Sequence, residues 1–119
     1  MIDIVEVGPR DGLQNERALI SVEDKAGLIH AVADAGLNHI EMGSFVNPER
    51  VPQMADTAAV LRAVGPLPGA LGMALVPTAR HLEEFLTSRA EVELNLGEVA
   101  VFVSATESFS QANLGCSVA

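Results

Sequence analysis

The amino-acid sequence predicts an α/β fold in which four consecutive strand-helix units build a parallel sheet with helices packed on it. Apolar runs that begin near residues 2, 39, 71 and 98 recur about every thirty residues, the spacing of right-handed βα units. The chain is 49% hydrophobic and has four Phe but no Trp or Tyr, so its core is aliphatic, as parallel sheets usually are. Polar residues follow each apolar run, at the strand ends where parallel-sheet enzymes place reacting groups.

The first unit consists of a strand at residues 2–7, which ends at Gly8-Pro9, and a helix that begins after Ser21. Ser21 precedes two acidic residues and a series of apolar residues at helical spacing, which is typical of a capped helix start. Gly36 is expected to close this helix.

The second unit contains a strand at residues 39–44 and, after the loop prolines Pro48 and Pro52, a helix at 54–64. The Gly- and Pro-rich segment 65–69 then separates this unit from the third.

The third unit contains a strand at residues 71–76 and a helix from about Ala79, and the fourth begins with a strand at 98–103. Between them, residues 91–96 alternate polar and apolar side chains, which alone would favour another strand. The register of segment 89–97 therefore stays open.

Charge and cysteine content exclude several classes of protein. A formal net charge of −9 disfavours binding to nucleic acid or to an anionic membrane, because no basic patch is available to neutralise phosphates. No apolar run approaches the roughly 18 residues of a membrane span, and a strand at the very start leaves no room for a targeting peptide. We expect a cytoplasmic protein, in which the single cysteine, Cys116, fills a loop.

The segment after the first strand joins flexible and charged residues, and it is the first candidate site. Gly8 and Gly12 flank Arg10 and Asp11. The carboxylate could ligate a divalent cation, and the guanidinium could donate to a developing oxyanion. The alternative is a surface turn with a solvated ion pair, which is common in proteins.

Glu41 is the second candidate, because a carboxylate between Ile40 and Met42 is costly to bury unless a cation, donor or metal pairs with it. It could instead face solvent. Gln14 and Ser44 are suited to orienting a substrate carboxylate or hydroxyl, although each could equally cap a loop. The three histidines have no metal-ligand spacing.

Five segments resemble one known family, the 3-hydroxy-3-methylglutaryl-CoA lyases. The resemblance covers nearly the whole chain and is carried by residues 6–16, 40–46, 51–54, 101–107 and 113–117. The Arg-Asp-Gly core belongs to a wider superfamily of metal-dependent aldolase and Claisen-type enzymes. The preceding Val-Gly-Pro and the following Leu-Gln-Asn-Glu point to the lyase branch.

The resemblance implies the N-terminal half of a (β/α)8 TIM barrel, with residues 1–119 as a partial domain of about four βα units. A complete barrel needs roughly 250 residues. The family's His-x-His metal ligands, its later Asn ligand and its catalytic cysteine loop belong to the second half, so Cys116 is not that cysteine. The isolated chain is therefore expected to be an inactive fragment.

The implied reaction is the cleavage of 3-hydroxy-3-methylglutaryl-CoA to acetyl-CoA and acetoacetate with Mg²⁺ or Mn²⁺ as cofactor. By this resemblance Arg10 and Glu41 are catalytic, Asp11 is a metal ligand, and Gln14 and Ser44 bind the acyl group. The expected partner is an acyl-CoA thioester.

Two alternatives remain open. The chain could be a non-catalytic half-barrel that associates with itself or with a complementary half. It could also belong to another acyl-CoA enzyme of the superfamily, although the residues that flank Arg10 make this less favoured.

Overall fold

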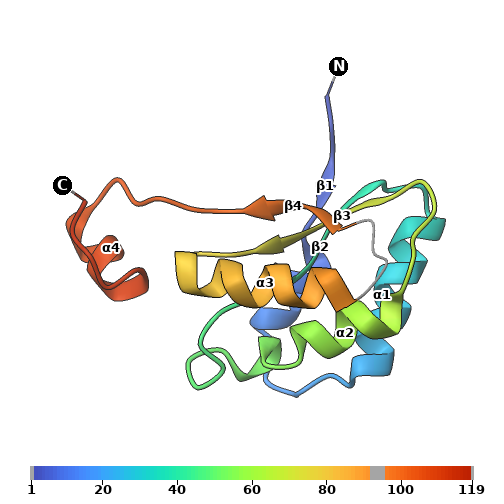
Figure 1. Cartoon of the computed structure of the whole chain (residues 1–119), viewed down its shortest axis with the longest axis horizontal. Coiled ribbons are helices and arrows are strands. Elements are labelled where there is room, and N and C mark those ends of the chain that lie inside the picture. The colour runs from blue at the N-terminus through green and yellow to red at the C-terminus, as the bar shows by residue number, and fades with distance from the viewer. Residues whose placement is uncertain (1, 92–95, 119) are drawn as a thin grey trace.

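The fold is a parallel four-stranded sheet with helices on one face. A computed structural model of the chain describes residues 2–91 and 96–118. The strands lie side by side in the order of the sequence, and every neighbouring pair is parallel (Figure 1). The strands are β1 (Val5–Glu6), β2 (His39–Ser44), β3 (Leu71–Leu75) and β4 (Leu96–Ala100). The helices are η1 (Gly8–Gly12), α1 (Val22–Asp34), η2 (Pro52–Met54), α2 (Thr57–Val64), α3 (Ala79–Glu91) and α4 (Glu107–Asn113).

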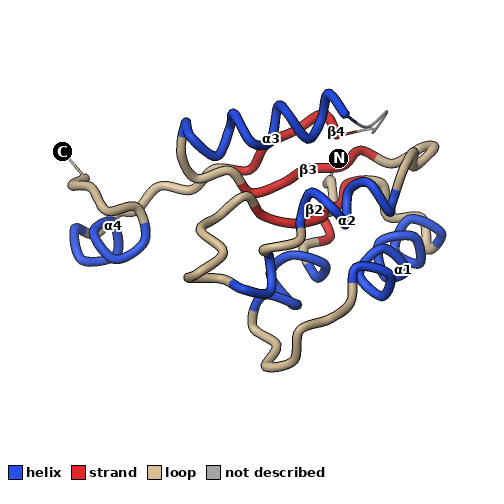
Figure 2. The backbone as a smooth tube through the Cα atoms, turned by 60° about the horizontal axis from the view of Figure 1, so that its bottom comes forward, coloured by secondary structure: helices blue, strands red, loops and turns tan. Residues whose placement is uncertain are grey.

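Helices α1, α2 and α3 cover one face of the sheet, and the described α-helices leave the other face open (Figures 1 and 2). Ile29 of α1, Ile40 of β2 and Leu61 of α2 are fully buried in the core between these two layers. In β3 the buried residues Gly72 and Ala74 alternate with partly exposed neighbours. The structure thus has a closed helix-covered face and an open face.

Helix α1 forms as expected. The Ser21 Oγ accepts a hydrogen bond from the Asp24 N–H at 3.1 Å, which satisfies one of the donors left free in the first turn. After the last turn Gly36 adopts a φ of 91°, a left-handed conformation that favours glycine.

The outer strands are displaced from their expected positions because a strand persists only where a partner pairs with it. Strand β1 is shorter than the expected 2–7, since Val5 already pairs with His39, the first residue of β2. Strand β4 begins and ends earlier than the expected 98–103, since its pairing ends where Ala100 meets Leu75, the last residue of β3. Of the open segment 89–97, α3 continues to Glu91 and β4 starts at Leu96, whereas residues 92–95 lie outside the described residues.

The expected helix at 54–64 is divided into η2 and α2. Asp56 has φ and ψ of −101° and 11°, which interrupts the helical backbone. Strand β3 ends one residue before the expected position, and α3 begins at Ala79 as expected. The short helices η1 and α4 had no counterpart among the expected elements.

Candidate active site

The turn after β1 directs two charged side chains to different surroundings. Helix η1 is a wide turn in which the N–H groups of Arg10 and Asp11 both donate to the Val7 carbonyl, at 3.1 and 2.6 Å. The Gly8 N–H donates to Glu6 Oε1 at 2.6 Å, and a Cβ on Gly8 would meet that oxygen at 2.8 Å. A larger residue at the entrance to the turn would therefore displace the Glu6 carboxylate from its bond to the Gly8 N–H.

Arg10 joins Glu41 and Asp11 in a charged cluster at the carboxyl ends of β1 and β2. Its Nε lies 2.8 Å from Glu41 Oε2, and its Nη1 lies 2.8 Å from Asp11 Oδ1. The Glu41 side chain is 3% exposed, the Arg10 side chain 17% and the Asp11 side chain 57%. The three residues are therefore in direct contact, and the exposure of their side chains rises from Glu41 through Arg10 to Asp11.

The position of Glu41 follows from strand alternation. Ile40 and Met42 pack into the core beneath the helices, so Glu41 between them lies on the open face of the sheet. It is nevertheless buried, because η1 packs against β2 and places the guanidinium beside the carboxylate. A buried carboxylate needs such a partner, since its desolvation is otherwise very costly.

The chemistry of the cluster is an oriented cation beside an accessible carboxylate. Arg10 uses Nε–H and one Nη1–H for its two ion pairs, and a guanidinium has further N–H groups on the Nη atoms. These could bind a developing oxyanion. The exposed Asp11 carboxylate offers the hard oxygen that Mg²⁺ or Mn²⁺ prefers.

The metal-ligand set is incomplete in the described part of the chain. Residues 2–91 and 96–118 contain no group of three or more His, Cys, Asp or Glu side chains placed to hold a metal ion. A Mg²⁺ ion needs roughly six oxygen ligands, several of them usually water. The described residues therefore do not form a complete metal site around Asp11.

Ser44 is held by its backbone rather than by its hydroxyl. Its N–H donates to the Thr57 Oγ1 at 3.2 Å, and that hydroxyl in turn lies 2.9 Å from the Ser44 carbonyl oxygen. The Ser44 Oγ is buried and has no hydrogen-bond partner among the described residues. A buried hydroxyl without a partner is uncommon and leaves a donor for a group that the described residues do not supply.

Gln14 lies beside a separate hollow at the carboxyl ends of the strands. This hollow has a volume of about 810 Å³, and its lining includes Gln14, Arg50, Thr78, His81, Phe102 and Asn113. Arg10, Asp11, Glu41 and Ser44 are not part of this lining. Arg10, Asp11 and Glu41 are thus joined by direct contacts, whereas no described contact joins Gln14 or Ser44 to them.

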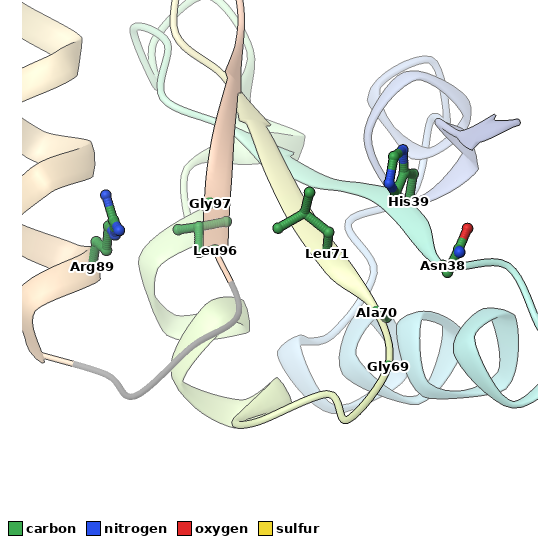
Figure 3. Close-up of a pocket in the computed structure, with 8 residues that line it drawn as sticks. All are labelled: Asn38, His39, Gly69, Ala70, Leu71, Arg89, Leu96 and Gly97. Atoms are coloured by element: carbon green, nitrogen blue, oxygen red, sulfur yellow. The ribbon is translucent and has the colours of Figure 1, made fainter. Parts of the chain in front are cut away.

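A second hollow lies at the opposite end of the sheet. It has a volume of about 470 Å³ and is bordered by His39 and Leu71, at the starts of β2 and β3, and by Arg89 (Figure 3). None of its lining residues is acidic. In a parallel α/β enzyme the reacting groups lie at the carboxyl ends of the strands, which favours the charged cluster as the reactive site.

Thr57 was not predicted as a site residue. It is buried at the start of α2, and its hydroxyl contacts the end of β2. The only sequence signal was a Thr at a helix start, which is common for capping.

Sequence and structural comparisons identify the family. The whole chain, residues 1–119, matches the HMGL-like family. A "3-hydroxy-3-isohexenylglutaryl-CoA/hydroxy-methylglutaryl-CoA lyase" of Pseudomonas aeruginosa is 47% identical over 117 residues, which are 98% of this chain and 37% of the relative. A crystal structure of the hydroxymethylglutaryl-CoA lyase from Pseudomonas aeruginosa superposes with a TM-score of 0.83 at 48% identity, covering 98% of this chain and 37% of the other. An HMG-CoA lyase from Acinetobacter baumannii, solved with coenzyme A and 3-methylmalate, superposes with a TM-score of 0.83 at 25% identity, covering 98% of this chain and 36% of the other.

The parallel sheet and its helices match the N-terminal part of the barrel in these lyase structures. The chain belongs to the HMGL-like family. It spans about 37% of the length of the Pseudomonas relatives that it matches.

Proposed function

We propose that this chain supplies the N-terminal part of a lyase that cleaves 3-hydroxy-3-methylglutaryl-CoA to acetyl-CoA and acetoacetate. The observation that carries the proposal is the contact of Arg10 with both Glu41 and Asp11 at the strand ends of an HMGL-like chain. The names of the Pseudomonas relatives support the substrate class, an acyl-CoA thioester.

In the proposed reaction the substrate loses the proton of its C3 hydroxyl group, and the bond between C2 and C3 breaks. C3 becomes the ketone carbon of acetoacetate, and the bonding electrons pass into the enolate of acetyl-CoA, which is then protonated at C2. Arg10 donates to the enolate oxygen through its Nη groups. Glu41 holds the guanidinium plane through Nε, so that the donors are oriented before the charge develops.

Asp11 is the proposed metal ligand, and the cation is Mg²⁺ or Mn²⁺. When bound, the cation would polarise the C3 oxygen and favour loss of its proton. Asp11 contributes a carboxylate that is more than half exposed and already oriented by Arg10. Arg10 thereby contacts the proposed metal ligand and also donates to the enolate oxygen, on which the negative charge develops.

Gln14 and Ser44 are the proposed contacts of the acyl group. Gln14 borders the larger hollow near the strand ends, and the Ser44 hydroxyl has a donor to spare.

Across residues 2–91 and 96–118, no helix has both the length and the apolar character needed to cross a bilayer. We place the activity in the cytoplasm.

A second candidate function is association without catalysis. In β3, Leu71, Met73 and Leu75 are partly exposed and alternate with buried Gly72 and Ala74, so they lie on the open face, which the described α-helices do not cover. Such a face favours contact with another copy or with a complementary half-barrel. If this candidate function is correct, even a complete barrel would show no turnover.

The decisive experiment replaces Arg10 in a full-length barrel that contains residues 1–119. Arg10→Lys keeps the positive charge but loses the planar fork that contacts Glu41 and Asp11 together. We expect kcat to fall by about a hundredfold, with a much smaller change in KM. Steady-state kinetics with an acetyl-CoA release assay measures both.

Arg17→Lys is the matched control, since Arg17 is exposed. An unchanged kcat in Arg10→Lys would remove Arg10 from the chemical step. Absence of turnover in the unmodified full-length barrel would favour the association candidate.

A further inference from the structure

The segment around η2 supplies no reacting group, yet it contacts the loop after η1, helix α1 and the end of β2. We propose that Gln53 is a positioning residue, which ties the segment that follows Arg10 and Asp11 to the end of β2. This inference rests on the proposed function, because it concerns residues assigned to that reaction.

The first connection runs from Gln53 to the loop after η1. The Gln53 Nε2 donates to the Glu16 carbonyl oxygen at 2.7 Å, across 37 positions of sequence. The Glu16 N–H donates to the Leu13 carbonyl, and the Asn15 side chain donates to the Asp11 carbonyl at 2.8 Å. Gln53 therefore anchors the far end of a turn that carries both Asp11 and Gln14.

The second connection fixes the backbone of Gln53 from α1. The Lys25 Nζ lies 2.6 Å from the Gln53 carbonyl oxygen and 2.6 Å from Asp56 Oδ1. The Lys25 side chain is only 5% exposed, so both contacts form with little competition from water. Gln53 is thus held by a rigid helix rather than by a free loop.

The third connection reaches β2 through Thr57. Its Oγ1 lies 2.8 Å from the Met54 carbonyl oxygen and 2.9 Å from the Ser44 carbonyl oxygen. One hydroxyl therefore joins the end of η2 to the residue proposed to contact the acyl group. The η2 segment spans from the loop after β1 to the end of β2.

Of these three connections, only the side-chain bond from Gln53 to Glu16 can be removed without disturbing the core. Lys25 and Thr57 are buried, and their replacement would leave buried polar groups without partners. The bond from Gln53 to Glu16 is exposed, so its loss frees the loop while the helices and sheet keep their contacts.

The test compares Gln53→Met, which has a similar length but no donor, with Gln53→Lys, which keeps a donor. The control is Gln111→Met, which removes an exposed bond within α4, from Gln111 Nε2 to Glu107 Oε1. Amide hydrogen exchange of the full-length barrel that contains residues 1–119, resolved by peptide with mass spectrometry, reports the opening of residues 10–16 directly.

We expect exchange in residues 10–16 to become about fivefold faster in Gln53→Met, which corresponds to the loss of one hydrogen bond. Exchange should return toward the original rate in Gln53→Lys, remain unchanged in Gln111→Met, and stay constant in β2 and β3 of all three variants. Equal acceleration throughout the chain, or none in residues 10–16, would overturn the proposal.

The functional readout uses the same variants in the full-length barrel. A positioning role predicts a lower kcat for Gln53→Met, recovery in Gln53→Lys, and little change in melting temperature. Faster exchange with an unchanged kcat would refute a role in the reaction. Because exchange needs neither substrate nor metal, failure of this inference remains distinguishable from failure of the proposed function.

Discussion

Arg10 has two tasks that a substitution affects at once. It compensates the charge of the buried Glu41, and it presents donors at the open side of the cluster. A loss of activity after its replacement could therefore reflect either a lost catalytic group or a loosened strand end. The two effects can be separated by measuring the free energy of unfolding of variants that lack the charge of Arg10, the charge of Glu41, or both.

We predict that Arg10→Met lowers the free energy of unfolding by about 3 kcal/mol, because it leaves the Glu41 carboxylate buried without its cation. The double variant Arg10→Met with Glu41→Met should recover most of this loss, since neither charge then remains. Urea unfolding monitored by circular dichroism measures the four corners of this cycle.

Arg80→Met is the control for this cycle. Arg80 Nε lies 4.0 Å from Glu84 Oε1 on the surface of α3, with the arginine side chain 86% exposed. Its loss should change the free energy of unfolding by less than about 0.5 kcal/mol. A double variant as unstable as Arg10→Met alone would contradict the ion-pair explanation.

The sequence predicted the residues of the charged cluster better than the contacts of Ser44 and Thr57 at the end of β2. Arg10, Asp11 and Glu41 could be placed together because each follows or lies within an apolar run, and parallel strands bring such ends to one edge. The unpartnered Ser44 hydroxyl and the role of Thr57 depend on side-chain distances across 13 positions, which no periodicity encodes.

At the scale of elements, local signals predicted α1, β2 and α3 well. The Ser21 cap and the Gly36 stop are chemical signals that act within one helical turn. The ends of β1 and β4 instead depend on the neighbouring strand, and the sequence of either strand alone cannot show where that neighbour stops. The wide turn η1 likewise depends on two N–H groups that share one carbonyl oxygen.

Gly43 is required by the irregularity in β2, and we predict that Gly43→Ala destabilises the protein. Pairing with β3 shifts register between Glu41 and Gly43, and a Cβ on Gly43 would meet Thr57 Cγ2 at 2.7 Å. Both groups are buried, so the loss should be about 1–3 kcal/mol in thermal or urea unfolding.

Gly27→Ala is the matched control within α1. A Cβ there would have no neighbour within 4 Å, and alanine is the better helix former by about 0.5–1 kcal/mol. This variant should be more stable than the parent. If both substitutions destabilised the protein equally, close packing at Gly43 would not be the cause.

Helix α4 gives a prediction about pH. The Val118 N–H donates to Glu107 Oε2 at 3.0 Å, and the Gln111 amide donates to Oε1; these bonds lower the pKa of Glu107 below its usual 4.5. The ionised form is thus favoured in the folded turn, so this stabilisation is present above pH 4.5 and is lost as the pH falls through the lowered pKa.

Carboxyl titration by NMR should show Glu107 titrating below 4.5, with the Val118 amide signal following the same curve. In Gln111→Met the pKa should rise partway toward its usual value. A Val118 signal that does not respond in this range would rule out the bond between Val118 and Glu107.

At the scale of the whole molecule, the sheet has one protected face and one open face. Met73 alternates with Ala74 of the core, so Met73 and its strand neighbour Glu98 lie on the open face. The strands β1 and β4 are edges with one partner each, and exposed apolar side chains lie next to them. Unpaired edges and apolar faces favour association with another chain.

We therefore predict that the 119-residue chain self-associates, binds divalent cations weakly and shows no lyase turnover. Multi-angle light scattering over a range of concentrations should show a mass that increases with concentration. Met73→Glu, which adds a charge to the open face, should shift the mass toward the monomer.

Leu86→Glu is the control, since Leu86 lies on α3 and is already 49% exposed. It should leave the association unchanged. A monomeric parent chain that turns over substrate would show that residues 1–119 are sufficient for the activity.

The contact between Arg10 and Glu41 has a consequence for the order of events during synthesis. These residues are 31 positions apart, so the contact is complete within the first two strands and the helix between them. Closing a loop of this length costs little entropy, and synthesis delivers both residues before β3 and β4. The charged cluster can thus assemble on the nascent chain before β3 and β4 emerge, and the later strands then add to an edge on which the Arg10 guanidinium already has its orientation.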